Sequence, residues 1–284
     1  MTRRQIPSHR PARTLSRRRF VLLLGAGGVA ATTCASSMAV FLLLARQENT
    51  RQAIRRILAT QTAAAQLTAT PEPIVRPPIV PRDEWGALPP DHTVRNEHGF
   101  YSMANPEGWR VYLPPIAEIY RTAVIHHSAF FSGNDISTLL EIQRQHREQR
   151  QWADIAYHFL VGKSGTIYEG RALNVRGTHV EGFNTGSVGI CLLGDFRYEQ
   201  PTQAQLDAAL QLVRWLAAEL QLTHLAGHSD FNPDTTCPGA HVIPYLRVLA
   251  DGAGLTLGTG GYMPPPEQLT LTPPDPPAVP PGER

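Results

Sequence analysis

Residues 82–250 alternate between two patterns of hydrophobic and polar positions. Short apolar runs predict strands at 121–127, 157–161, 166–169, 187–193 and 224–228. Apolar positions at helical spacing predict helices at 135–149 and 202–220. The turn sequence Gly162-Lys163-Ser164-Gly165 favours a hairpin, and the pair Thr202 and Gln205 has the spacing of a capping box. Strands that alternate with helices predict an α/β or α+β domain with a single mixed central β-sheet flanked by helices.

A long uncharged stretch precedes this domain. Residues 20–44 form 25 consecutive positions without a charge, and a helix of that length reaches about 37 Å, enough to cross a bilayer. Residues 1–19 hold seven arginines and no acid. Because basic residues mark the cytoplasmic side, we expect the domain to lie outside the cytoplasmic membrane, anchored by this N-terminal helix.

The start of the uncharged stretch also resembles an export signal. Ser16-Arg17-Arg18-Arg19-Phe20 is similar to a twin-arginine motif, whose pathway carries folded proteins; the alternative is an ordinary Arg-rich export signal. Ser37-Met38-Ala39 fits a cleavage site, but cleavage there would leave an apolar stump at 40–44. We therefore expect an uncleaved anchor, the alternative being a secreted protein with its leader removed.

The composition on either side of the domain predicts extended segments. Residues 45–81 read as a stalk followed by a linker with five prolines at 71–81. Residues 251–284 are rich in Gly and then in Pro, with nine prolines between 264 and 281. Such a composition does not build a core and predicts a disordered tail. The stretch between these segments, residues 82–250, has the length of a single domain.

The distribution of charge excludes nucleic acid as a partner. The formal net charge is +2, with 26 basic and 24 acidic residues. Without the seven arginines of the leader, 26 − 7 = 19 basic residues face 24 acidic ones, about −5 for the remainder. A nucleic-acid-binding domain needs a basic face on the folded part of the chain.

Three cysteines do not form a disulfide framework, and only Cys237 lies in a loop of turn-forming residues. His228 lies nine positions before it, and imidazole and thiolate are ligands that Zn²⁺ prefers. The best source of a third ligand is the pair His126 and His127 at the end of a predicted strand. Side chains alternate along a strand, so only one of the two can face the site, and periodicity does not choose between them.

Seven short blocks, in this order, resemble the peptidoglycan recognition protein and type 2 N-acetylmuramoyl-L-alanine amidase family. They are RDEWGA (82–87), VIHHS (124–128), WADIAYHF (152–159), IYEGR (167–171), GTH (177–179), NTGSVGI (184–190) and GHSD (227–230). The resemblance covers roughly residues 82–245, essentially the whole predicted domain. It implies the fold of that family and a monomer that binds peptidoglycan or muropeptides.

The resemblance also implies a metal site. His126 is then the ligand of the histidine pair, and His228 and Cys237 complete a Zn²⁺ site with an open fourth position. This is the arrangement of a catalytic zinc, at which the pKa of bound water falls to about 7. The implied reaction is hydrolysis of the amide between N-acetylmuramic acid and L-alanine. The alternative is a non-catalytic recognition module, because family members without the thiolate ligand bind peptidoglycan and do not cut it.

Four more residues acquire roles from the resemblance. Tyr157 matches the active-site tyrosine, which orients water or donates to the oxyanion. Thr235 lies where some members carry a lysine, so it offers a hydroxyl and no charge, and the general acid is not identified. His179 and Asn184 match positions that line the substrate groove. The aromatic residues of an inserted segment at 88–118 are expected to pack over the sheet, the alternative being contact with glycan.

Overall fold

The computed structural model describes residues 73–264, together with Glu48 and Gln52. Contacts divide the chain into two units, 1–72 and 73–284, and the folded domain belongs to the second. The expected leader and membrane anchor at 1–44 lie outside the described residues, as does the tail beyond 264. Within the described part of the chain, no helix has the length and apolar character needed to span a membrane.

A single mixed sheet forms the centre of the domain, as predicted. Its strands are β1 (Ile79–Val80), β2 (Thr122–His127), β3 (Phe159–Val161), β4 (Ile167–Glu169), β5 (Ser187–Leu192), β6 (His224–Gly227) and β7 (Thr256–Leu257). They lie in the order β1-β4-β3-β5-β2-β6-β7. The pairing of β3 with β4 is antiparallel, which confirms the predicted hairpin, and the other pairings are parallel.

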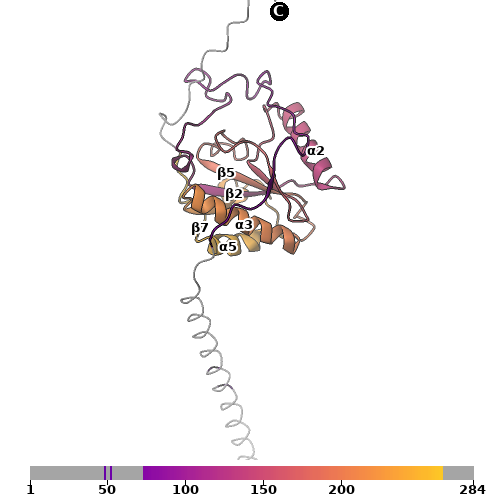
Figure 1. The fold of residues 1–284 in the computed structure, drawn as a ribbon, viewed down its shortest axis with the longest axis vertical. Coiled ribbons are helices and arrows are strands. Elements are labelled where there is room, and N and C mark those ends of the chain that lie inside the picture. The colour runs from indigo at the N-terminus through magenta and orange to yellow at the C-terminus, as the bar shows by residue number, and fades with distance from the viewer. Residues whose placement is uncertain (1–47, 49–51, 53–72, 265–284) are drawn as a thin grey trace, which may run out of the picture. The chain divides into compact units, whose positions relative to one another are not determined.

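Helices cover both faces of the sheet (Figure 1). They are α2 (Asp135–Glu148), α3 (Gln203–Glu219), α4 (His228–Phe231), α5 (Ile243–Gly252) and a 3-10 turn, η1 (Ile116–Glu118). Apolar side chains of α3 and α5 pack on one face, and α2 packs on the other. Thr202 caps α3 by accepting the N–H of Gln205 (3.1 Å), as the sequence predicted.

Strand β2 lies between two parallel neighbours and is buried along its whole length. Ala123 and Ile125 point into the core beneath α3 and α5. His126 therefore points to the opposite face, beside Cys191 of β5. The alternation predicted for the two histidines is thus observed, and it places His126 on the face that carries α2.

The ordered sheet extends beyond the predicted boundaries at 82 and 250. Strand β1 comes from the expected linker and β7 from the expected tail, and each forms one edge of the sheet. Two residues are too few to show an alternating pattern, so neither strand could be predicted from the sequence. In the inserted segment Tyr112 packs into the core of the sheet, whereas Trp109 joins a smaller cluster with Val175.

Candidate metal centre and substrate groove

The three predicted ligands converge at one end of the sheet. His126 lies near the end of β2, and His228 follows directly after β6, its parallel neighbour, so both emerge at the same edge. Cys237 comes from the loop after α4. The ligand atoms of the three residues all lie within 4.8 Å of one another. His126 Nδ1 lies 3.6 Å from Cys237 Sγ, so Nδ1 is the nitrogen that faces the candidate metal position.

The electrostatics of the cluster fit a zinc ion. Burial, followed by the neighbouring histidines, lowers the pKa of His126 well below its usual value. Burial likewise lowers the pKa of His228, so both imidazoles are neutral, as ligands must be. Burial raises the pKa of the Cys237 thiol to about 12, and a cation is therefore needed to hold it as a thiolate. Two imidazoles and one thiolate, with no fourth protein ligand among the described residues, match a catalytic zinc site.

Tyr157 lies beside the cluster, with its ring centroid 5.1 Å from that of His126. Burial, together with nearby Cys191 and Cys237, raises the pKa of its phenol well above the usual value. The phenol therefore keeps its proton and can donate a hydrogen bond. The N–H of Ala156, the residue before it, donates to His146 Nδ1 (3.0 Å), which fixes the tyrosine's backbone to α2.

His179 lines the groove, as the resemblance implied, but only the edge of its ring is exposed there. Its side chain is buried and lies behind His126, with His179 Nδ1 3.0 Å from His126 Nε2. Its other nitrogen, Nε2, lies 3.4 Å from the carbonyl oxygen of Ser187. The ring borders the groove, but both of its nitrogens have partners inside the protein. A hydrogen bond from this imidazole to substrate is therefore not what the geometry favours.

Asn184 and Thr235 each use one oxygen to hold the site together. Asn184 Oδ1 accepts the backbone N–H groups of His179 (2.6 Å) and Val180 (2.7 Å). Its Nδ2 has no partner in the described part of the chain, and the residue lines the groove. Thr235 Oγ1 accepts the N–H of Cys237 (3.2 Å), which holds the thiol loop. Substrate contact by either side chain stays a prediction.

Two cavities meet at the cluster. The larger, of about 830 Å³, extends from His228 toward the inserted segment and the loop that carries Asn184. The smaller, of about 370 Å³, extends from Cys237 along α2 and contains Tyr157. His228, Thr235 and Arg150 line both. The candidate metal position therefore lies where two arms of one groove join.

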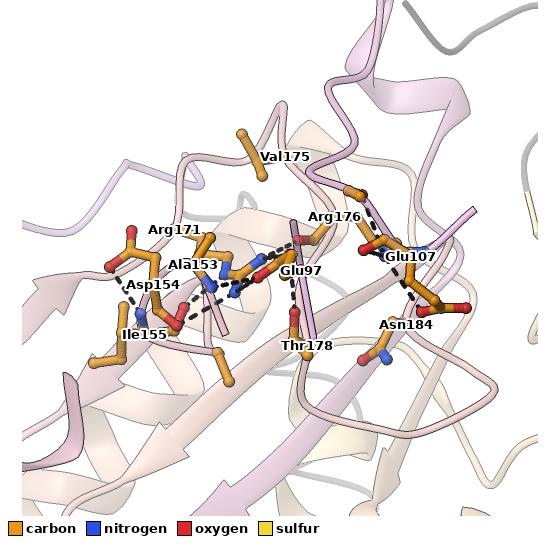
Figure 2. Close-up of polar contacts among 12 residues, drawn as sticks. Glu97, Glu107, Ala153, Asp154, Ile155, Arg171, Val175, Arg176, Thr178 and Asn184 are labelled. Carbon is orange, nitrogen blue, oxygen red and sulfur yellow. Dashed lines mark hydrogen bonds and ion pairs between the residues drawn. The ribbon is translucent and has the colours of Figure 1, made fainter. Parts of the chain in front are cut away.

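A buried ion pair between Glu97 and Arg171 supports the groove, and no motif in the sequence indicates it (Figure 2). The two terminal nitrogens of the Arg171 guanidinium, Nη1 and Nη2, donate to Glu97 at 2.6 and 2.7 Å, and both side chains are almost fully buried. Glu97 also accepts the N–H of Ala153, and Arg171 Nε donates to the carbonyl oxygen of Ile155. The pair thus fastens the inserted segment to the stretch that leads into Tyr157. Its partners are 74 positions apart, so no local pattern could reveal it.

The fold and the site define an α/β protein with a single mixed sheet and a candidate His-His-Cys metal site in an open groove. The family described as N-acetylmuramoyl-L-alanine amidase matches residues 117–240. Peptidoglycan-recognition protein SC2 of Drosophila melanogaster is 38% identical over 142 residues, covering 46% of this chain and 75% of that protein. Peptidoglycan-recognition protein LB of the same species is 32% identical over 174 residues, covering 55% of this chain and 75% of that protein.

Among solved structures, bumblebee PGRP-SA aligns with a TM-score of 0.50 and 26% identity, covering 61% of this chain and 95% of that chain. The chain belongs to the family of peptidoglycan recognition proteins and N-acetylmuramoyl-L-alanine amidases. Membership makes peptidoglycan the common target and leaves two activities within the family, cleavage and recognition.

Proposed function

We propose that the protein is a zinc-dependent N-acetylmuramoyl-L-alanine amidase, which hydrolyses the amide between N-acetylmuramic acid and the L-alanine of the stem peptide. The observation that carries the proposal is the complete ligand set, with three ligand atoms within 4.8 Å of one another. A module that only recognises peptidoglycan has no need of a cysteine placed within ligand distance of two imidazoles. The position of the cluster, where two arms of a groove join, also suits a substrate with a large group on each side of the bond to be cut.

When bound at this site, zinc supplies a Lewis acid and lowers the pKa of water. The chain's own groups supply the rest. Tyr157 donates its phenol proton in a hydrogen bond to the oxyanion that develops on the attacked carbonyl. The Asn184 Nδ2 group donates to a carbonyl of the stem peptide, and the Thr235 hydroxyl forms a hydrogen bond near the leaving nitrogen. These contacts orient the amide over the metal position.

Hydrolysis of defined muropeptides by the purified full chain tests the proposal. We expect mass spectrometry to detect free stem peptide. Its release should stop when a chelator is added and should return when Zn²⁺ is restored. Cys237→Ala should abolish both bound zinc and release. Cys191→Ala is the control for bound zinc, because Cys191 is also a buried free cysteine but is no member of the ligand cluster. Binding of muropeptides without any release, in zinc-loaded protein, would overturn the amidase and favour the recognition module.

A further inference from the structure

The hydrogen bonds around His179 determine where His126 carries its proton. The carbonyl oxygen of Ser187 can only accept, so His179 Nε2, 3.4 Å away, is the protonated nitrogen. In a neutral imidazole with its proton on Nε2, Nδ1 is left as an acceptor. His126 Nε2, 3.0 Å from that Nδ1, is then the donor. The lone pair of His126 Nδ1 consequently faces Cys237 and the metal position.

A second, independent observation shows that the fold reserves room for this imidazole. A Cβ atom at Gly189 would lie 2.6 Å from Cδ2 and Cγ of His179, and one at Gly177 would lie 2.5 Å from Cδ2. Gly189 lies in β5 opposite Val124 of β2, and on its other side its carbonyl oxygen accepts the N–H of His158, just before β3. Glycine weakens a strand at such a position and commonly marks a close approach by another group. Here that group is the His179 ring.

We propose that His179 is a positioning residue, which holds His126 in the Nε2-protonated tautomer with Nδ1 directed at the metal. The inference rests on the metal centre of the proposed function and not on the reaction performed there. It gives His179 a role distinct from the substrate contact implied by the family resemblance. Acceptors behind ligating histidines typically contribute about 10–100-fold to metal affinity.

Two variants of similar size separate this role from simple packing. His179→Asn keeps an acceptor oxygen near the position of Nδ1, whereas His179→Leu has none. We expect zinc affinity to fall by about 10–100-fold in His179→Leu and to recover largely in His179→Asn. Thermal unfolding of both zinc-free variants shows whether they lose stability to the same extent. Equal zinc affinities in the Leu and Asn variants, or wild-type affinity in the Leu variant, would overturn the inference.

The tautomer itself can be observed without turnover. Long-range ¹H–¹⁵N NMR of zinc-free protein with labelled histidines should show His126 protonated at Nε2 in the wild type and in His179→Asn. In His179→Leu we expect a mixture of tautomers. A wild-type His126 protonated at Nδ1, or a wild type that binds no zinc, would contradict the proposal. Because neither readout uses substrate, a protein with these properties that failed to cut muropeptides would refute the amidase alone.

Discussion

Four neighbouring histidines of this domain hold their protons on the same nitrogen, Nε2, and the partners of each ring decide this: His126, His127, His158 and His179. His127 Nδ1 accepts the N–H of Phe196 (3.2 Å) on the face opposite His126. His158 Nδ1 accepts the N–H of Gly189 (3.0 Å), and its Nε2 donates to the carbonyl oxygen of Val175 (2.9 Å). Each ring is therefore held neutral, and of these four histidines His126 is the one whose Nδ1 lone pair faces the candidate metal position.

The phenol of Tyr157 should contribute to turnover and not to metal binding. Tyr157→Phe removes the donor to the oxyanion, and the loss of one such donor typically costs about 10²–10³ in kcat. Zinc content should be unchanged, because Tyr157 is not part of the ligand cluster. Single-turnover hydrolysis of a muropeptide, together with metal analysis, measures both. A Phe variant with wild-type kcat would remove Tyr157 from the mechanism.

His158 should make the domain less stable in acid. Burial lowers its pKa from 6.5 to about 4, and protonation of Nδ1 would set two N–H groups against each other. The neutral ring thus stabilises the fold fully above pH 6.5, and this contribution is lost as the pH falls toward 4. This difference between the pKa of the unfolded and the folded protein corresponds to about 3 kcal/mol of unfolding free energy.

Urea unfolding of zinc-free protein at several pH values measures how the unfolding free energy changes with pH. In His158→Gln, which does not titrate, the drop in unfolding free energy between pH 6.5 and 4 should be smaller by about 3 kcal/mol. The other histidines with lowered pKa values are present in both proteins, so their contributions to the pH dependence cancel in the comparison. Parallel pH profiles for the two proteins would show that His158 is not the group responsible.

The ligand residues could be predicted from the sequence, whereas the role of His179 could not. His228 and Cys237 share one loop, and the order of the motifs supplied His126. The tautomer of His126 depends instead on contacts between β2, the loop after β4 and the start of β5, segments that no spacing rule relates. Asn184 is a similar case, because its Oδ1 is engaged by backbone that only the folded loop brings near.

At the scale of elements, the inserted segment is held by the Glu97–Arg171 pair. Glu97→Ala leaves the Arg171 charge buried without a partner, which should cost about 3–5 kcal/mol of unfolding free energy. Turnover should fall more than zinc affinity, because the pair supports the stretch before Tyr157 and not the ligands.

Glu107→Ala provides the matched control for this experiment. Glu107 is in the same inserted segment, but its side chain is 79% exposed and its carboxylate lies 3.8 Å from Arg176. An exposed pair of this kind should change stability by less than about 1 kcal/mol. If the two variants unfold at the same urea concentration, the buried pair does not hold the segment.

The two helices and five strands that the apolar patterns predict match the structure to within a few residues, whereas helix α5 was not predicted. The helices begin at Asp135 and Gln203 after side-chain caps, and the strands that carry the core fall within the predicted runs. The inserted segment could not be predicted in this way. Its order comes from single buried side chains such as Trp109 and Glu97, which meet partners distant in sequence.

At the scale of the whole molecule, we propose that the twin-arginine-like leader sends the domain across the cytoplasmic membrane. Replacement of both Arg17 and Arg18 by lysine should leave the protein in the cytoplasm of an expressing bacterium, because lysine does not reproduce the paired-arginine signal. Fractionation with antibody detection measures the distribution. Unchanged export of the lysine variant would favour the ordinary export signal.

The two short edge strands have a consequence for solubility. An exposed sheet edge offers unpaired N–H and C=O groups to another chain, and short edge strands limit that pairing. Strands β1 and β7 have two residues each and cover β4 and β6, which are longer. A chain cut to 82–250 should therefore self-associate as its concentration rises, whereas 73–264 should not, as light scattering would show. The residues that form β1 and β7 would then protect the domain from aggregation. This protection would matter most where many copies of the protein lie close together on one surface.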